Sequence, residues 1–312
     1  MFVDLKRQYR ASLKSMDTEE RIDLYFYRPI GFAWAYLFRK LGVRPNAITI
    51  ASIFIGVAGG ICFYFNETWI NLIGILLIIW ANSFDSADGQ LARLTNDYSR
   101  LGRILDGLSS ELWFVAIYIA ICLHENTFSA WFGVHPWVIW CLGSVAGICH
   151  AQQARMADYY RQFHLLCVRG KNNTELENSE ELREALEKLS WRKDFVRKLV
   201  QTCYYNYTLS QESATRNLQT LRHEMRRHWP DGSLPPALSR AIRMESLPLM
   251  KYTNILSFNW RAITLFITVL IDQPWLYFVF EIVVLNTILI YMCRRHEKFC
   301  RRFAIQIREG KY

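Results

Sequence analysis

The sequence predicts an all-α integral membrane protein with six transmembrane helices, an N-terminal juxtamembrane helix and a helical cytoplasmic insertion. Hydrophobic residues make up 52% of the 312 residues and aromatic residues 15%, which excludes an intrinsically disordered chain. The 15 Gly and 8 Pro are too few for the many turns of an all-β protein. Apolar stretches that approach the roughly 20 residues needed to cross a bilayer recur along the chain.

Six apolar stretches are the predicted spans. They are Ile48–Phe65, Ile70–Phe84, Leu112–Leu123 with its preceding turns, Trp137–Cys149, Ile255–Ile271 and Trp275–Cys293. Several are shorter than a full span because polar residues occur at their ends. This pattern indicates helices whose cytoplasmic ends line a polar cavity, where ionisable groups stay hydrated.

The segment before the first span predicts one further helix. Tyr27–Lys40 combines aromatic and aliphatic residues with basic flanks, and Pro29 suits a first helical turn. We expect this helix to lie in the membrane interface rather than to cross the bilayer.

The distribution of basic residues predicts the orientation. Nearly all of the 37 Lys and Arg lie in the N-terminal tail, in the 93–103 turn, in 155–251 and in the C-terminal tail. The short connections at 66–69, 124–136 and 272–274 contain none. Because cytoplasmic loops of membrane proteins are enriched in Lys and Arg, both termini are expected in the cytoplasm. The net charge of +9 is then juxtamembrane charge, and no DNA- or RNA-binding motif accompanies it, so nucleic acid is not an expected partner.

The chain therefore divides into five predicted regions. These are 1–45 with the cytoplasmic tail and juxtamembrane helix, 46–157 with the first four spans, 158–250 as the cytoplasmic insertion, 251–293 with the last two spans, and 294–312 as a basic cytoplasmic tail. Within the insertion, Thr174 and Glu177 have the spacing of a capping box. A second helix is expected over Glu212–His228, ending before Pro230.

Three aspartates at the cytoplasmic ends of two spans indicate a metal site. Asp85 and Asp88 are three residues apart at the end of one span, so their carboxylates share a helix face. Asp106 lies on the helix that returns into the membrane. Three converging carboxylates repel one another at low dielectric unless a cation lies among them, and oxygen ligands select Mg²⁺ or Mn²⁺. A metal at the membrane boundary suits a pyrophosphate whose lipid tail lies in the bilayer.

Small and basic residues accompany these carboxylates. Gly89 and Ala92 would let a ligand approach the helix backbone, and Arg93 offers a forked donor for phosphate. Gly102 allows close helix packing or leaves room for a nucleotide. The alternative is a static charge network, in which the three acids pair with arginines. These arginines are Arg93, Arg100 and Arg103.

The full pattern is DxxDGxxAR from Asp85 to Arg93, then eight residues, then GxxxD from Gly102 to Asp106. It resembles the signature of the CDP-alcohol phosphotransferase (CDP-alcohol phosphatidyltransferase) family. The resemblance also covers the six-span layout and the Pro45–Thr49 entry to the first span, but not the 158–250 insertion. It implies a membrane enzyme of phospholipid biosynthesis that transfers a substituted phosphate from a CDP-linked donor to a hydroxyl and releases CMP. A homodimer is implied as well.

The resemblance assigns roles position by position. Asp85, Asp88 and Asp106 match metal-binding aspartates, with two ions implied. The positions that match those shaping the CDP site are Gly89, Ala92, Arg93 and Gly102. The family pattern calls for a fourth Asp, the presumed general base, where this chain has Ser110.

The departure at Ser110 leaves three accounts open. The neighbouring Glu111 takes over the role of the base, although one residue on a helix is about 100° of rotation. Alternatively, the alcohol substrate carries its own base, for example a phosphate. Ser110 itself does not fill this role, because a hydroxyl is a poor base at pH 7. In the third account the protein is a catalytically impaired partner subunit or scaffold.

The resemblance allows two substrate layouts. In one, CDP-diacylglycerol donates a phosphatidyl group to a polar alcohol such as glycerol 3-phosphate, serine, inositol or inositol phosphate. In the other, CDP-choline or CDP-ethanolamine donates to a lipid hydroxyl. Six spans favour the first layout. Basic residues near the inner helix ends, among them Arg155, predict a phosphorylated polyol such as inositol phosphate as the acceptor.

Overall fold

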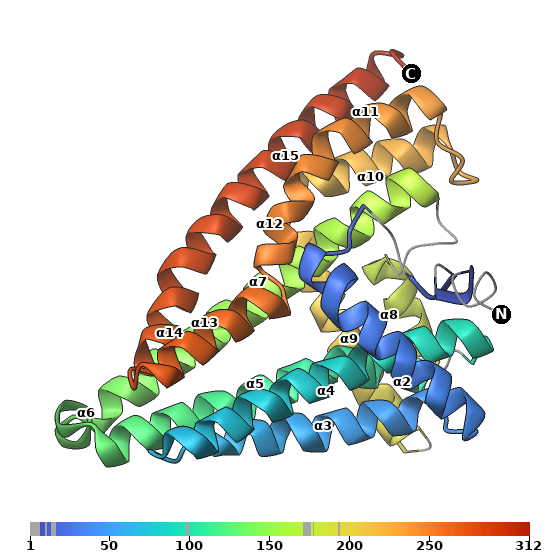
Figure 1. The fold of residues 1–312 in the computed structure, drawn as a ribbon. Coiled ribbons are helices and arrows are strands. Elements are labelled where there is room, and N and C mark those ends of the chain that lie inside the picture. The colour runs from blue at the N-terminus through green and yellow to red at the C-terminus, as the bar shows by residue number, and fades with distance from the viewer. Residues whose placement is uncertain are drawn as a thin grey trace. The chain divides into compact units, whose positions relative to one another are not determined.

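A computed structural model describes residues 7–9, 11–13, 17–97, 100–170, 176, 178–192 and 194–312. All regular secondary structure in this part of the chain is helical, as the sequence predicted (Figure 1). The chain forms two compact units. The first unit comprises Met1–His150 and Phe258–Val284, and the second comprises Ala151–Ser257 and Leu285–Tyr312.

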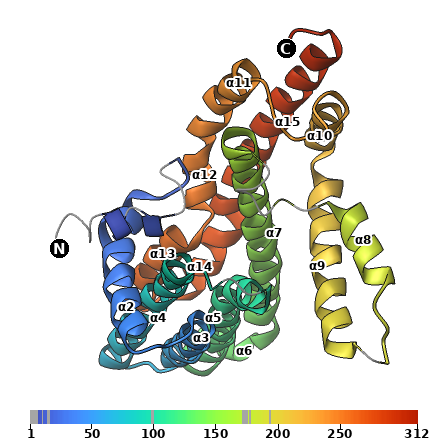
Figure 2. The same ribbon diagram turned by 90° about the vertical axis from the view of Figure 1, so that its right-hand side faces the viewer.

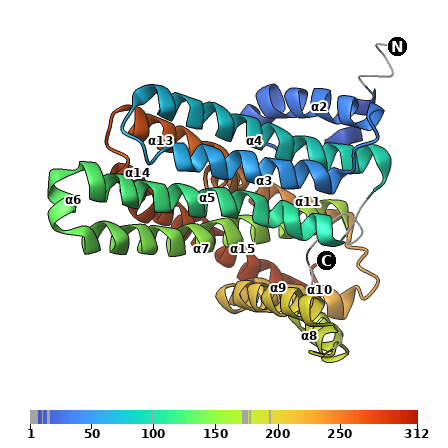
Figure 3. The ribbon, with the colours of Figure 1, turned by 90° about the horizontal axis from the view of Figure 1, so that it is seen from below.

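The first unit is a bundle of long helices. In chain order its elements are η1 (Asp23–Tyr27), α2 (Arg28–Lys40), α3 (Pro45–Cys62), α4 (Thr68–Thr95), α5 (Arg100–Phe128), α6 (Ala130–Val134), the first part of α7 (Pro136–Arg169), α13 (Phe258–Leu270), α14 (Trp275–Val279) and most of η4 (Phe280–Leu285). Helices α3, α4 and α5 lie side by side with roughly aligned axes (Figure 3). The helix predicted at Tyr27–Lys40 is present as α2, with Pro29 in its first turn, and its place in the membrane interface stays a prediction.

Glycines on α3 and α4 bring the helix backbones close together. A Cβ built on Gly56 would lie 2.2 Å from the buried indole of Trp113 on α5. On the other side of α3, a Cβ on Gly74 of α4 would lie 2.9 Å from the carbonyl oxygen of Gly59. Any side chain at these positions would push the helices apart, so small residues set the spacing of the bundle.

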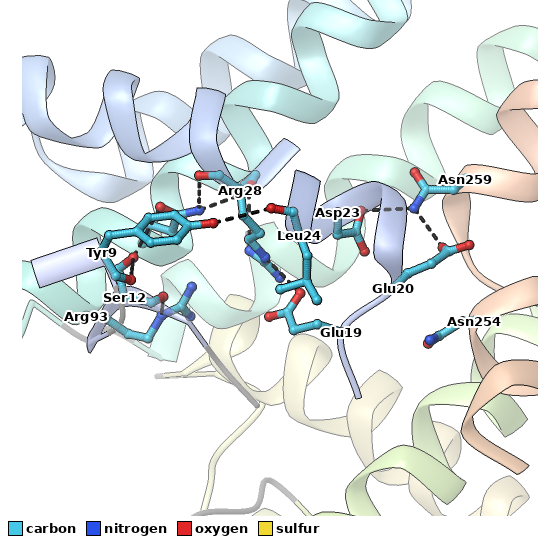
Figure 4. Close-up of polar contacts among 12 residues, drawn as sticks. Tyr9, Ser12, Glu19, Glu20, Asp23, Leu24, Arg28, Arg93, Asn254 and Asn259 are labelled. Atoms are coloured by element: carbon cyan, nitrogen blue, oxygen red, sulfur yellow. Dashed lines mark hydrogen bonds and ion pairs between the residues drawn. The ribbon is translucent and has the colours of Figure 1, made fainter. Parts of the chain in front are cut away.

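The N-terminal elements pack on the end of α4. Gly31 of α2 lies so close to α4 that a Cβ there would be 2.8 Å from Ser86 Oγ. Arg28 Nη1 donates to the same Ser86 hydroxyl at 3.2 Å, and Arg28 Nε donates to Glu19 at 2.9 Å. Asn259 of α13 donates to Glu20 and Asp23 at 2.7 and 2.9 Å (Figure 4). These contacts fix α2 against the polar end of the bundle.

Four helices of the described part are long and apolar enough to cross a membrane. They are Pro45–Cys62, Thr68–Thr95, Leu105–Phe128 and Trp275–Arg308. The predicted span Trp137–Cys149 lies inside α7, and Ile255–Ile271 overlaps α13, whose 13 residues would extend only about 20 Å. Four of the six spans are therefore supported, and the count of six stays a prediction.

The second unit consists of more polar helices together with the second half of α7. They are α8 (Ser179–Glu187), α9 (Phe195–Ala214), α10 (Arg216–His228), α11 (Pro236–Ser246), η3 (Leu247–Leu249), α12 (Met250–Ile255) and α15 (Asn286–Arg308). Helices α8 and α9 lie side by side, and α10, α11 and α12 pack against α15 (Figure 2). Backbone N–H groups of Asn217 and Leu218 donate to the Glu297 carboxylate at 2.7 and 3.3 Å, so α15 caps the start of α10.

Two details of the predicted insertion differ from the structure or fall outside it. Thr174 and Glu177, the predicted capping box, lie outside the described residues, and the N-cap of α8 is Asn178. For the helix predicted over Glu212–His228, the predicted end is confirmed and the predicted start is wrong. The chain leaves helical geometry at Thr215 (φ −127°, ψ 57°), so 212–214 belong to α9 and a new helix begins at Arg216.

A buried ion pair joins α13 to the π-helical turn η4 in the first unit. Arg261 Nη1 lies 2.5 Å from Glu281 Oε2, and both side chains are at most 1% exposed. The Tyr277 hydroxyl donates to the other oxygen of Glu281 at 2.6 Å. Removing one partner would leave the other charge buried without compensation, whereas removing both would not.

We expect Arg261→Met alone to lower the free energy of unfolding by about 3–5 kcal/mol. Glu281→Leu alone should cost a similar amount, and the double variant should be closer to the wild type than either single variant. Thermal unfolding of the purified protein in detergent measures this. A loss in the double variant equal to the sum of the two single losses would show that the two residues do not stabilise the bundle as a pair.

Candidate metal centre

Three aspartates of the first unit come together as the sequence predicted. Asp85 and Asp88 lie near the C-terminal end of α4, and Asp106 lies in the second turn of α5. One carboxylate oxygen from each residue lies within 4.8 Å of the others. Helices α4 and α5 therefore present their acids to one point.

Asp88 is the innermost carboxylate and is held by a hydroxyl group from a third helix. Asp88 is only 3% exposed. Thr49 of α3, itself 2% exposed, donates its hydroxyl to Asp88 Oδ2. Pro45 starts α3, and its carbonyl oxygen also lies within hydrogen-bond distance of Thr49 Oγ1, at 3.3 Å. The N-terminal turn of α3 thus fixes the orientation of the buried acid.

Ser109 orients a second member of the cluster. Its hydroxyl donates to Asp85 Oδ1 at 2.5 Å and lies 2.8 Å from the carbonyl oxygen of Asp106. Ser109 is fully buried between α4 and α5. Because it lies three residues after Asp106, the two residues share a face of α5.

The donor set fits a hard divalent cation. Three carboxylates so close together carry strong mutual repulsion where water is excluded, and a bound cation removes it. All three ligands are oxygens, the set that Mg²⁺ and Mn²⁺ prefer over softer metals. Two of the three acids are oriented by hydroxyl groups, which is typical of ligands supported by a surrounding layer of hydrogen bonds.

One face of α4 beside the carboxylates is left open by the packing. Asp85, Gly89, Ala92 and Arg93 are half-exposed, whereas the residues between them at 86–88, 90 and 91 are buried. A Cβ built on Gly89 would meet only the guanidinium of Arg93, at 3.5 Å or more. Protein packing therefore does not require a glycine there, and the open backbone suits the close approach of a ligand.

Arg93 lies across this open face and is tied to the N-terminal segment. Its Nε donates to the carbonyl oxygen of Ser12 (Figure 4). The Ser12 hydroxyl in turn donates to Gln90 at 3.3 Å. The guanidinium is therefore positioned beside Gly89. The sequence predicted that this group donates hydrogen bonds to a phosphate. The side chains of Arg100 and Arg103, the other members of the alternative charge network, lie outside the described residues.

The remaining predicted residues fall in different places. Gly102 and Ser110 are half-exposed on α5, and Ser109, rather than Ser110, contacts the carboxylate cluster. The Glu111 side chain is 40% exposed, and its Oε2 lies 3.9 Å from Nε2 of the buried His150. Arg155 belongs to the second unit, where it donates to Ser210 and Gln152.

Sequence reasoning missed Thr49, Ser109 and His150. Ser109 could have been found, because its spacing from Asp106 places it on the same helix face. Thr49 and His150 lie on other helices, and no local pattern connects them with the aspartates. Their roles depend on how α3 and α7 pack against α4 and α5, which only the tertiary structure reveals.

Part of the chain that contains this site is similar to known proteins. Residues 42–157 match the family model for CDP-alcohol phosphatidyltransferase. A curated protein of Cereibacter sphaeroides is 28% identical over 96 residues, and one of Rickettsia felis is 29% identical over 82 residues. Both are named CDP-diacylglycerol--glycerol-3-phosphate 3-phosphatidyltransferase. The matches cover 30% and 26% of this chain, and they span 40% and 45% of the length of these relatives.

Residues 42–157 thus match the family that the motif predicted, and the resemblance is supported over this part of the chain. The matched region contains Thr49, all three aspartates and Ser109. It ends before the insertion, so the comparisons do not address residues 158–250.

We expect Thr49→Val to weaken binding of Mn²⁺ about 10-fold or more, because the near-isosteric side chain leaves Asp88 without the hydroxyl that orients it. Electron paramagnetic resonance of the purified protein titrated with Mn²⁺ measures this affinity. Ser52→Ala is the matched control, since Ser52 is a buried hydroxyl one turn further along α3 that donates to the backbone of Thr49. Equal affinities of the Thr49→Val variant and the wild type would contradict a role of Thr49 at the centre.

Proposed function

We propose that this protein is a phosphatidyltransferase of phospholipid biosynthesis, which transfers a phosphatidyl group from CDP-diacylglycerol to a phosphorylated polyol and releases CMP. The observation that carries the proposal is the carboxylate cluster beside the open backbone of Gly89, inside a CDP-alcohol phosphatidyltransferase domain. The cluster lies on apolar helices long enough to cross a membrane. A donor with a lipid tail and a pyrophosphate head would meet both features at once.

In the proposed site each group of residues has a separate task. Asp85, Asp88 and Asp106 would hold Mg²⁺ or Mn²⁺, with two ions as the family resemblance implies. The bound metal would neutralise charge on the donor pyrophosphate. The face formed by Gly89 and Ala92 would admit the donor close to the α4 backbone. Arg93 would donate to a phosphate oxygen through its forked guanidinium. Gly102, in the first turn of α5, would leave space for the nucleotide.

We assign the general base to Glu111. In the reaction the acceptor hydroxyl attacks the phosphorus that carries the diacylglycerol, the bond from this phosphorus to the CMP oxygen breaks, and the hydroxyl proton moves to the base. Ser110 at the family's base position is a weak base near pH 7. The Glu111 carboxylate is partly exposed and lies five residues beyond Asp106 on the same helix. A local change in the winding of α5 would bring it to the acceptor.

The acceptor is proposed to be a phosphorylated polyol. The two relatives carry glycerol 3-phosphate in their names, and we place it first, with inositol phosphate as the second choice. Arg155 is proposed to contact the acceptor phosphate. The two hydrogen bonds that the structure gives its guanidinium go to neutral groups, the Ser210 hydroxyl and the Gln152 amide oxygen.

The orientation and assembly are part of the proposal. The excess of Lys and Arg in the tails and the insertion supports cytoplasmic termini and a cytoplasmic site. A homodimer follows from the family resemblance. Ser110 favours a second candidate function, a catalytically impaired subunit or scaffold. A donor of the CDP-choline or CDP-ethanolamine type is the remaining alternative.

We expect the purified protein to release CMP from CDP-diacylglycerol when Mg²⁺ and one phosphorylated polyol are present. The panel should include glycerol 3-phosphate, inositol phosphate, inositol and serine, with CDP-choline as the alternative donor. Chelation by EDTA should abolish release and added Mg²⁺ should restore it. Asp88→Asn should reduce turnover by at least about 100-fold, because it removes a carboxylate that would hold the metal.

Asp97→Asn is the matched control, because Asp97 is an exposed acid in the α4–α5 connection and is not one of the three clustered carboxylates. It should leave turnover within about twofold of the wild type. Nucleotide binding without release from any donor would refute the transferase proposal and favour the impaired subunit.

We expect Glu111→Gln to lower kcat by about 100-fold or more with little change in KM, because a neutral amide cannot accept the proton. Ser110→Asp in the Glu111→Gln background should restore part of this loss, since it places a carboxylate at the family's position. Initial rates at saturating donor measure both variants. Full activity of Glu111→Gln would show that the acceptor supplies its own base, and a large gain from Ser110→Asp alone would show that the native site is impaired.

A further inference from the structure

His150 is a buried histidine that lies between two carboxylates of the first unit. It is 5% exposed, at the end of the part of α7 that belongs to this unit. Its Nε2 lies 3.9 Å from Glu111 Oε2, and its Nδ1 lies 3.8 Å from Glu281 Oε1. Glu111 is next to the predicted base position, whereas Glu281 belongs to the buried ion pair. His150 therefore connects the vicinity of the metal centre with the charged interior of the bundle.

The groups behind His150 are rigid. Glu281 is bound by Arg261 at 2.5 Å and by the Tyr277 hydroxyl at 2.6 Å. Glu281 lies in η4, and single π-helical turns inside helices are frequent at functional sites. The charge of Glu281 is matched by Arg261, so it does not need His150 as a further cation. The histidine can stay neutral in this environment.

The hydrogen bonds around the imidazole indicate which ring nitrogen carries the proton. The Tyr118 hydroxyl lies 3.3 Å from Nδ1 and donates to it when Nδ1 is unprotonated. Glu281 Oε1 already accepts a hydrogen bond from Tyr277 and lies beyond hydrogen-bond distance of Nδ1. We assign the proton to Nε2, which faces Glu111. The centroid of the Phe114 ring lies 4.4 Å from that of the His150 imidazole, so Phe114 restricts rotation of the imidazole.

We propose that His150 is a positioning residue that acts through Glu111, orienting its carboxylate with the Nε2–H group. This inference rests on the proposed function, in which Glu111 is the base. The present separation of 3.9 Å is longer than a hydrogen bond, and a movement of about 1 Å by the flexible Glu111 side chain closes it. Contacts of this kind are often long before the substrate binds. The hydrogen bond from His150 would hold the Glu111 side chain in one rotamer. One oxygen of its carboxylate would then stay directed at the hydroxyl of the acceptor.

Two substitutions at His150 separate this role from a purely structural one. The amide nitrogen of Gln reaches the place of Nε2, whereas that of Asn reaches only the place of Nδ1. His150→Gln keeps a donor for Glu111, and we expect its kcat to stay within about 10-fold of the wild type. His150→Asn loses that donor, and we expect its kcat to fall about 100-fold with KM within twofold. If His150 only completed the packing around Glu281, the order of the two variants would be reversed.

Glu111 provides a second test. In the Glu111→Gln background, His150→Asn should change kcat by less than twofold, because the group on which it acts is gone. The same loss in both backgrounds would overturn the proposal. His124→Gln is the matched control, since His124 is 6% exposed, lies 3.8 Å from Asp272, and follows Glu111 by thirteen residues on α5. It should leave kcat within twofold of the wild type.

A measurement without turnover keeps this inference separate from the proposed function. The infrared difference spectrum between wild type and Glu111→Gln isolates the carboxylate stretching band of Glu111. With CDP-diacylglycerol bound, the frequency of this band should differ from the wild type in His150→Asn. In His150→Gln it should differ from the wild type by less than the width of the band. An unshifted band in His150→Asn would refute the contact. Absence of CMP release by the wild type would instead refute the proposed function, whatever the band shows.

Discussion

The repulsion among three carboxylates held within 4.8 Å of one another is the constraint on which the rest of the first unit depends. Such a cluster is stable only when other groups hold the acids in place and a cation or solvent compensates their charge. Thr49 and Ser109 provide part of that support from α3 and α5. The glycines that allow α3 to pack closely on both neighbours, Gly56 and Gly59, therefore serve the site as well as the bundle.

The same bundle contains two charged regions with different roles. At the ends of α4 and α5 the acids remain beside an open helix face, where a ligand can reach them. Deeper in the unit, Arg261 and Glu281 neutralise each other and bind Tyr277, so they add fixed polarity without a net charge. His150 lies between these regions. Buried ionisable groups in a membrane protein are costly to retain, and the proposed connection to the chemistry would explain why this chain keeps them.

Much of this could be predicted from the sequence because the signals are local. The apolar stretches, the proline at the start of α2 and the spacing of Asp85, Asp88 and Asp106 each depend on a few neighbouring residues. The structure supports four spans and brings the three aspartates together. The break at Thr215 and the contact of Ser109, rather than Ser110, with Asp85 were not predicted. Thr49 and His150 were also missed, because their contacts arise only when helices far apart in sequence pack together.

We propose that the three aspartates hold a divalent cation against the pyrophosphate of a CDP-linked lipid. Phosphorus-31 NMR of CDP-diacylglycerol bound to the protein tests it directly when Mn²⁺ is added in small amounts. We expect strong paramagnetic broadening of both pyrophosphate resonances in the wild type. Asp106→Asn should lose this broadening. Unbroadened resonances in the wild type, with the donor bound, would show that the aspartates do not hold a cation against the pyrophosphate.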